Sequence, residues 1–365
     1  MTFLSYSPQL AGLAANPALP EWLLERFVAA AGEDLRADLA CRSDLRQDLW
    51  DDLNPALEVV RHPLPPEWDR NTPPGVLFAL SAAHDDEVDL GLAGNPATPP
   101  AILADLMERP ASWWNLVSRS DLPQSAYVRL AADSRPAICW NVVTNPAMSE
   151  SSLREVAVGA DRDLRRHLVR NPSIPLDLLV DLAPKTRIGP ETPPRIRCAT
   201  VEELRQLAAS PVMQVRMLVA ERRHLPADLV ELLLADRDRG VAKGIVTDPA
   251  VTAEQVWALV ARHGPHLYPR AARNPNCTPA LLHHLVVNAT GVEKVYRAVA
   301  RHPRAAGSTL SLCLADREAR RDAARHPNLP VETIIELLAA ESAVAESAAS
   351  NPSLPVAVMA ELIGV

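Results

Sequence analysis

Glycine, cysteine and long apolar runs are all scarce in this chain, and each scarcity excludes a class of protein. Thirteen glycines among 365 residues form no Gly-rich phosphate-binding loop. No stretch approaches the roughly 18 consecutive apolar residues that a membrane-spanning helix needs. The first residues also lack the basic and apolar regions of a secretory leader. We therefore expect a cytoplasmic protein of bacterial type.

The five cysteines are isolated from one another and predict neither a disulfide framework nor a metal centre. No C-x-x-C pair occurs, which fits buried thiols in a reducing compartment. His283 and His284 lie near Cys277, but no second cysteine or carboxylate stands at ligand spacing. The cysteines are Cys41, Cys139, Cys198, Cys277 and Cys313.

Motifs of catalysis are missing as well. The sequence contains no H-E-x-x-H motif and no Ser-His-Asp order with a supporting motif. The acidic run at residues 85–87 is typical of a solvated turn. We therefore expect a protein that is not an enzyme and that has no cofactor, no metal ion and no small-molecule substrate.

Proline, by contrast, is abundant and regularly placed. The 34 prolines sit at fixed phases of a period of about 26 residues, typified by Asn171-Pro172-Ser173-Ile174-Pro175 before a Leu-rich run. A period in this range is typical of a stacked repeat array. The marked position of each unit is its first proline or the substitute for it. The marked residues are Pro17, Asp44, Arg70, Pro96, Asp121, Pro146, Pro172, Cys198, Arg223, Pro249, Pro275, Pro303, Pro327 and Pro352.

Each unit has the pattern of a short helix, a turn and a longer helix. Seven and ten residues after the mark the chain is almost always apolar, as at Leu179 and Leu182. This spacing places both side chains on one face of a helix. The polar exceptions are Asp51, Asn54 and Arg205. A second proline three residues after the mark is expected at the first position of the longer helix.

These units predict an all-α, right-handed helical-repeat solenoid of about fourteen repeats of about 26 residues. We expect it to form a single domain over residues 1–365. Irregular insertions are predicted near residues 54–68 and 184–194, because extra prolines interrupt the helical periodicity there.

The repeated motif resembles the leucine-rich repeat variant family, a bacterial array of alternating short 3₁₀ and α helices. The resemblance is carried by Val169-Arg170-Asn171-Pro172 and the leucines up to Leu182, and it covers nearly the whole chain. It implies a superhelix similar to HEAT-type solenoids and implies little about function. An iron–sulfur cluster in a cysteine-rich N-terminal module is known in the family. Only Cys41 precedes residue 139 here, so this cluster is not expected.

An asparagine or a histidine precedes the proline in many units. One interpretation is a row of ligand-binding groups. The favoured interpretation is structural, because short polar side chains at helix ends satisfy backbone groups and can bond to the adjacent unit. These residues are Asn16, Asn95, Asn145, Asn171, Asn274, Asn351, His62, His302 and His326.

Charge is unevenly distributed along the chain. The formal net charge is −8, yet residues 161–330 hold 26 Lys and Arg against 18 Asp and Glu. Equivalent positions on the short helices carry arginine, with Trp and Tyr interleaved, so stacking would align them in a ladder. Arginine beside aromatic faces suits an acidic peptide or a phosphate backbone. Alternatively, the arginine stems cover apolar surface and pair with acids of neighbouring units.

We therefore expect a non-enzymatic scaffold that binds an acidic protein partner along this ladder, without a membrane. The alternative is a nucleic-acid-binding protein that uses the basic 161–330 region, although the sequence pI of about 5.7 counts against it. Trp114 and Trp140 fall on the outward phase, unlike Trp113, and exposed tryptophan is typical of binding hot spots. The predicted partner-binding residues are Trp114, Trp140, Arg165, Arg166, Arg170, Arg216, Lys243, Arg270, Arg273, Tyr296, Arg297, Arg301, Arg320, Arg321 and Arg325.

Overall fold

The computed structural model describes residues 4–53, 64–186, 188–189, 191–289 and 291–365, and this part of the chain is helical. The one bridge between extended segments there is an isolated parallel pairing of Leu4 with Ala31. The predicted all-α helical-repeat fold is thus confirmed. The chain divides into two compact units, residues 1–59 with 245–365 and residues 60–244. The count of fourteen repeats and the single domain over residues 1–365 stay predictions.

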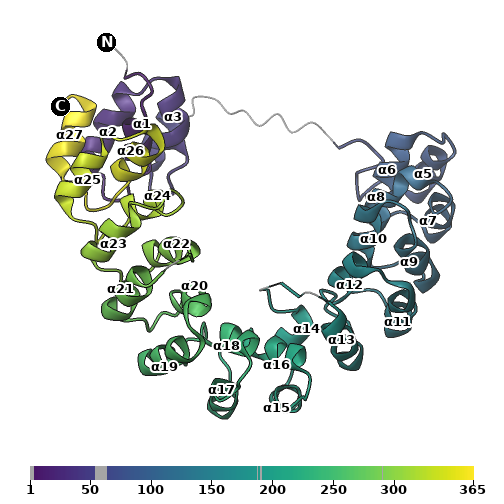
Figure 1. Ribbon diagram of the computed structural model, residues 1–365. Coiled ribbons are helices and arrows are strands. Elements are labelled where there is room, and N and C mark those ends of the chain that lie inside the picture. Colours follow the sequence, from purple (N-terminus) through teal and green to yellow (C-terminus); the bar gives the residue numbers. More distant parts are fainter. Residues whose placement is uncertain (1–3, 54–63, 187, 190, 290) are drawn as a thin grey trace. The chain divides into compact units, whose positions relative to one another are not determined.

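Helices follow one another along the chain (Figure 1). The helix before the turn is not always the shorter one, since the helices at residues 162–168 and 176–182 have seven residues each. In residues 4–53 the helices are α1 (Pro8–Ala14), α2 (Glu21–Ala30), α3 (Glu33–Ala40) and α4 (Gln47–Leu53). In residues 64–245 they are α5 (Pro74–Ser81), α6 (Asp86–Gly94), α7 (Pro100–Leu106), η1 (Pro110–Ser112), α8 (Trp113–Leu116), α9 (Gln124–Ala131), α10 (Pro136–Val143), α11 (Glu150–Gly159), α12 (Arg162–Leu168), α13 (Leu176–Leu182), η2 (Ala183–Lys185), α14 (Pro194–Arg197), α15 (Val201–Ala208), α16 (Met213–Ala220), α17 (Ala227–Leu234) and α18 (Arg239–Ile245). In residues 253–363 they are α19 (Ala253–His263), η3 (Pro265–Leu267), α20 (Tyr268–Ala271), α21 (Pro279–Val287), α22 (Lys294–Ala300), α23 (Gly307–Cys313), α24 (Arg320–Ala324), α25 (Val331–Leu337), α26 (Ser342–Ala349) and α27 (Val356–Ile363).

Helices α12 and α13 illustrate how the sequence builds one repeat. The side chain of Asp161 caps α12 by accepting a hydrogen bond from the backbone N–H of Leu164 at 2.7 Å. The helix ends before the Asn171-Pro172 turn, since a residue before proline avoids the helical conformation. Pro175, with φ −59° and ψ 142°, then stands just before α13 as its N-cap.

Two expectations about the helices need correction. The second proline is the N-cap and not the first helical residue, because its extended ψ leaves its carbonyl oxygen to accept the first helical hydrogen bond. Prolines in this position are Pro20, Pro73, Pro99, Pro175, Pro226, Pro330 and Pro355. In addition, most short helices are α-helical within the described residues, whereas the family resemblance implied 3₁₀ helices. The 3₁₀ segments there are η1, η2 and η3.

Apolar residues of the longer helices form the core of each unit. Leu179 is fully buried and Leu182 nearly so, as their spacing from the mark predicts. The exceptions Asp51 and Arg205 are exposed, because the leucines at neighbouring positions face the core instead. Asn54 lies outside the described residues. The buried leucines of these two units are Leu49, Leu53, Leu204 and Leu207.

The asparagine before the proline is a buried residue that joins one repeat to the preceding one. The Nδ2 of Asn171 donates to the carbonyl oxygens of Val143 and Asn145, at 2.8 Å each, and its Oδ1 accepts from the N–H of Ser173 at 2.7 Å. The same three bonds recur at Asn16, Asn95, Asn145, Asn274 and Asn351. This agrees with the structural interpretation of the asparagine row. His62 lies outside the described residues.

Arginine replaces this asparagine in two repeats. The Nη1 of Arg119 donates to the carbonyl oxygens of Ala93 and Asn95, at 3.1 and 2.7 Å, and the rest of its guanidinium pairs with Asp121. Arg42 makes the same contacts with the residue 14 and residue 16 carbonyls. Counted from its mark Asp121, Arg119 falls at the phase of the predicted ladder, but its hydrogen bonds put it in the buried position of the asparagine.

The predicted insertion near residues 184–194 is partly regular, since it begins in η2 and runs into α14. Thr192 anchors it by donating to the carbonyl oxygen of Glu221 at 2.7 Å. Of the other predicted insertion, residues 54–63 lie outside the described residues. Among the helices described, none is both long and apolar enough to cross a membrane.

Candidate functional site

Six of the predicted partner-binding residues line one surface of the unit that contains residues 245–365. Two adjoining depressions, of about 730 and 380 Å³, share Arg297, Arg301 and Glu318 in their walls. We call their combined lining, from residue 273 to residue 347, the basic groove. The predicted residues in it are Arg273, Arg297, Arg301, Arg320, Arg321 and Arg325.

The repeat positions these cations on consecutive short helices. Lys294, Arg297 and Arg301 follow one another at spacings of three and four, so they share one face of α22 and its C-cap. Arg320 and Arg321 begin α24, and Arg325 is its C-cap residue. Because α22 and α24 pack against each other, these side chains meet in one groove.

Eight basic and four acidic side chains line the groove. Arg297 and Arg301 both reach Asp322, at 3.5 and 2.8 Å, and Arg297 lies 3.7 Å from Glu318. Arg320 lies 3.3 Å from Glu341. Pairing with acids of the neighbouring repeat, which was one of the two interpretations of the ladder, therefore describes these three arginines.

The other groove cations are not neutralised in this way. Within the described residues no carboxylate lies at ion-pair distance from Arg273, Lys294, Arg317, Arg321 or Arg325. Of these, Arg325 donates from its Nε to the Ser350 hydroxyl at 3.0 Å. The groove thus carries a local excess of positive charge, in a chain whose net charge is −8.

Two of these cations, Lys294 and Arg317, were missed by the sequence prediction. The signal for Lys294 is its position three residues before Arg297 on the same helix, which places both side chains on one face. Arg317 lies in the turn before α24 and has no counterpart at a fixed phase of the repeat.

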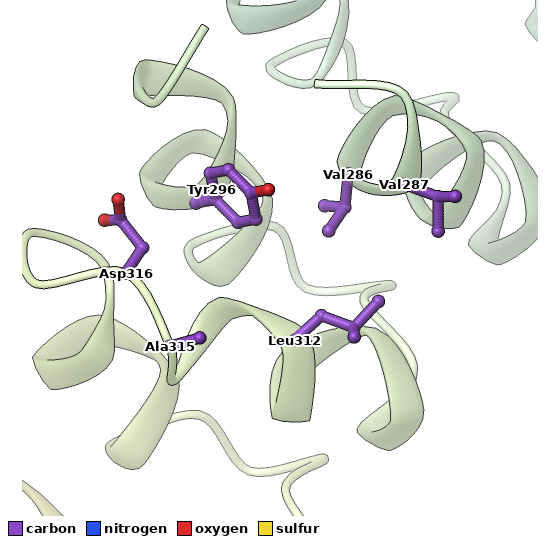
Figure 2. Close-up of a pocket in the computed structure, with 6 residues that line it drawn as sticks. All are labelled: Val286, Val287, Tyr296, Leu312, Ala315 and Asp316. Carbon is purple, nitrogen blue, oxygen red and sulfur yellow. The ribbon is translucent and has the colours of Figure 1, made fainter. Parts of the chain in front are cut away.

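An apolar pocket of about 500 Å³ borders α22, the helix that with its C-cap also carries three cations of the groove (Figure 2). Tyr296 lines this pocket and not the basic groove, facing Val286 and Val287 of α21 and Leu312 of α23. Val287 is 60% exposed and Leu312 is 41% exposed. Asp316 stands at the edge, where its carboxylate accepts hydrogen bonds from backbone N–H groups at the start of the next helix.

The predicted tryptophans lie in the other unit, residues 60–244. Trp113 is buried and donates from its Nε1 to the carbonyl oxygen of Met107 at 3.2 Å, whereas Trp114 is 48% exposed. Both agree with their repeat phases. Trp140 is half-buried, because its ring stacks on His167 with a centroid separation of 4.9 Å. Burial is the main cause that lowers the pKa of His167.

Some of the predicted cations of residues 60–244 form ion pairs within the chain. Arg216 pairs with Asp236 at 2.6 Å and with Asp238, and the bond to Asp236 raises the pKa of the guanidinium. Arg165 and Lys243 are half-buried. Arg166 and Arg170 are exposed and lie 3.6 Å from Asp163 and 3.7 Å from Glu191. In the 245–365 unit, Arg270 is half-buried and is not part of the groove lining.

The thiols and histidines of the described residues form no metal-binding cluster. Burial raises the pKa of Cys277 and of Cys313 to about 12, so both stay as neutral thiols. His302 and His326 are buried, and each bonds to the carbonyl oxygen of the preceding repeat, at 2.9 and 3.0 Å.

Comparison with known proteins bears on the repeat. Residues 242–303 match the family model of the Leucine Rich Repeat Variant domain. A solved structure described as a leucine-rich repeat variant with a novel repetitive protein structural motif is 19% identical; the match covers 66% of this chain and 83% of that one, with a TM-score of 0.30. An engineered protein is 14% identical over 94% of this chain and 92% of its own, with a TM-score of 0.22. No curated protein sequence matches.

The family model matches where the Asn-Pro turn and the leucine spacing are regular, around Asn274 and its neighbouring repeats. The same side-chain bonds and core positions recur on both sides of that stretch. Residues 242–303 are therefore similar to the Leucine Rich Repeat Variant domain, and the described residues form a helical-repeat fold.

Proposed function

We propose that this helical-repeat protein is a binding scaffold without catalytic activity, and that it holds an acidic segment of a partner protein in the basic groove. The observation that carries the proposal is the set of unneutralised cations Arg273, Lys294, Arg317 and Arg321 along one continuous groove. Like charges held close together repel, and a bound anionic segment removes this repulsion.

A protein segment fits the groove better than a nucleic acid does. Four carboxylates stand among the cations, and a phosphate backbone of uniform negative charge would be repelled by them. A peptide can place its acidic residues opposite the cations alone. The carboxylates are Glu293, Glu318, Asp322 and Glu341.

The apolar pocket adds a second element to this proposal. Tyr296 and Arg297 are consecutive residues of α22, so the pocket and the groove flank one helix. A partner segment that places one apolar side chain beside Leu312 and acidic residues along the groove would use both. Trp114, together with Arg166 and Arg170, is proposed as a separate contact in residues 60–244.

Binding of a labelled Glu-rich peptide containing one leucine, followed by fluorescence anisotropy, tests the proposal. We expect binding at low salt that weakens as salt rises, because exposed charges are screened. The variant Arg273→Glu/Arg321→Glu should bind at least about tenfold more weakly, since each reversal replaces attraction by repulsion. Neither arginine has an ion pair to lose within the described residues, so the fold should be unaffected.

Arg26→Glu is the matched control, because Arg26 is an exposed arginine of α2 that does not line the groove. Equal binding by the groove variant and this control would refute the groove as the binding surface. Labelled single-stranded and duplex DNA are measured in parallel. Tighter binding of DNA than of the peptide, lost in the groove variant, would replace the protein partner by a nucleic acid.

A further inference from the structure

The stacking order of the repeats differs from their order in the chain. In the unit of residues 1–59 and 245–365, α1 packs along α26, although about 330 residues separate them in sequence (Figure 1). Residues of both helices are fully buried, among them Leu13, Ala345 and Ala349. The N-terminal repeat therefore occupies the place of a repeat that follows the last one.

The hydrogen bonds of this contact are those of an ordinary repeat-to-repeat contact. The Nδ2 of Asn351 donates to the carbonyl oxygens of Ala324 and His326, at 2.8 and 2.9 Å. The Nδ2 of Asn16 donates in the same way to Ala349 and Asn351, at 2.9 and 2.8 Å.

The series then continues into the second repeat of the N-terminal segment. The Nη1 of Arg42 donates to the carbonyl oxygens of Ala14 and Asn16, at 2.8 and 2.9 Å. One row of side-chain-to-carbonyl bonds thus runs through residues 274, 302, 326 and 351 and on to residues 16 and 42.

Close approach of α1 to α26 depends on glycine. A Cβ atom at Gly12 would stand 2.0 Å from the carbonyl oxygen of Glu346 and 3.0 Å from the Cβ of Ala349. No side chain fits there without separating the helices. Gln9 adds a bond of 2.9 Å from its Nε2 to the carbonyl oxygen of Leu338.

Every copy of the chain carries both halves of this contact, and the cysteines of the described residues are free, so no disulfide joins the two halves there. We infer that the α26 face is a docking site for the N-terminal repeats, residues 7–53, of a second copy of this chain. The contact is heterologous, with different surfaces on its two sides. A donated segment would make every hydrogen bond named above, because it has the same sequence as the segment that occupies the face here.

Complementation between two full-length variants tests this inference. Gly12→Leu prevents the N-terminal repeats of its chain from packing on an α26 face and leaves the α26 face of the same chain intact. Ala349→Leu spoils the α26 face, because the Cβ of Ala349 points at Gly12, and leaves the donated segment intact. Neither variant can form the contact within one chain or with itself, whereas a mixture can form it once.

Sedimentation velocity and light scattering follow the two variants and their mixture. We expect each variant alone to be monomeric and the equimolar mixture to contain a 1:1 complex whose fraction rises with concentration. Adding Asn16→Ala to the Ala349→Leu chain should weaken that complex at least about tenfold, since two buried acceptors lose their donor.

Gly159→Leu is the control for the added side chain, because a Cβ at Gly159 meets no atom within 4 Å. It should form less of the 1:1 complex with Ala349→Leu than Gly12→Leu does, because its own N-terminal repeats compete for its α26 face. A mixture that stays monomeric at every concentration, while circular dichroism shows both variants to be folded, would overturn the inference. If Ala349→Leu is unfolded, the deciding measurement is the dimer fraction of the wild-type chain and of Gly12→Leu. The inference predicts dimer for the wild type and none for Gly12→Leu. No dimer in the wild type would overturn it.

Discussion

The side-chain amide of Asn16 lies 2.8 Å from the carbonyl oxygen of Asn351, a residue 335 positions later in the chain. Asn351 makes the same bond to His326 of its own preceding repeat. The two asparagines are thus consecutive members of one row. This row, and not the apolar core alone, fixes the register in which one repeat stacks on another.

Substitution of one asparagine of this row should destabilise the fold strongly. Asn171→Ala leaves the carbonyl oxygens of Val143 and Asn145 without their donor in a buried place. We expect a loss of about 2–4 kcal/mol in the free energy of unfolding, measured by urea denaturation. Asn288→Ala is the control, because that side chain is exposed and should change stability by less than about 0.5 kcal/mol. Equal losses in the two variants would contradict a structural role for the row.

The buried histidines of the row should make stability sensitive to acid. Burial lowers the pKa of both His302 and His326 from the usual value of 6.5. The unfolded chain therefore takes up protons before the folded chain does. Their contribution to stability is complete above about pH 6.5 and falls as the pH drops below it.

The variant His302→Asn/His326→Asn should lose less stability than the wild type between about pH 7 and about pH 5. Asparagine holds the equivalent place at Asn274 and Asn351 and does not titrate. The urea midpoint is measured at each pH. His167 is present in both proteins, so its titration does not contribute to the difference between them. An unchanged dependence on pH in the variant would show that these histidines are not its source.

Arg119 should respond as a structural residue and not as a surface cation. Arg119→Lys keeps the charge but loses the planar fork that joins two carbonyl oxygens to Asp121. We expect a loss of about 2 kcal/mol in the free energy of unfolding, measured by urea denaturation. Arg26→Lys, on the exposed surface of α2, should change it by less than about 0.5 kcal/mol. Similar small effects of both changes would show that the fork contributes nothing.

The apolar pocket should affect partner binding without affecting the fold. Leu312→Asp places a charge beside Tyr296, where the leucine is 41% exposed. The anisotropy assay should show weaker binding of the Leu-containing acidic peptide, by about tenfold, and an unchanged urea midpoint. A peptide with alanine in place of leucine should bind both proteins alike. If Leu312→Asp weakens the two peptides equally, the pocket does not receive the apolar side chain.

The repeat was readable in the sequence because its chemistry is local. An Asn-Pro turn, a proline at the helix start and leucines at fixed spacing each act within about ten residues, so a single unit predicts its own helices and core. Leu179 and Asn171 are therefore placed correctly. Where the mark was a polar substitute, as at Asp44, the phase slipped, so that Asp51 stood out as a polar exception although Leu49 and Leu53 fill the core of that unit.

Tertiary packing decided which side chains of equivalent sequence position are buried and which meet on one surface. Counted from their marks Pro303 and Asp121, Arg301 and Arg119 fall at one phase. Arg119, however, makes the hydrogen bonds of the asparagine row, where His302 is the equivalent residue, and Arg301 is an exposed cation paired with Asp322. Lys294 and Arg317 join the basic groove through the packing of successive short helices. The stacking of α1 on α26 is likewise absent from any local pattern. Repeats that make equivalent contacts can stack on one another at any pair of ends, and the order of repeats in the chain does not specify which two ends meet.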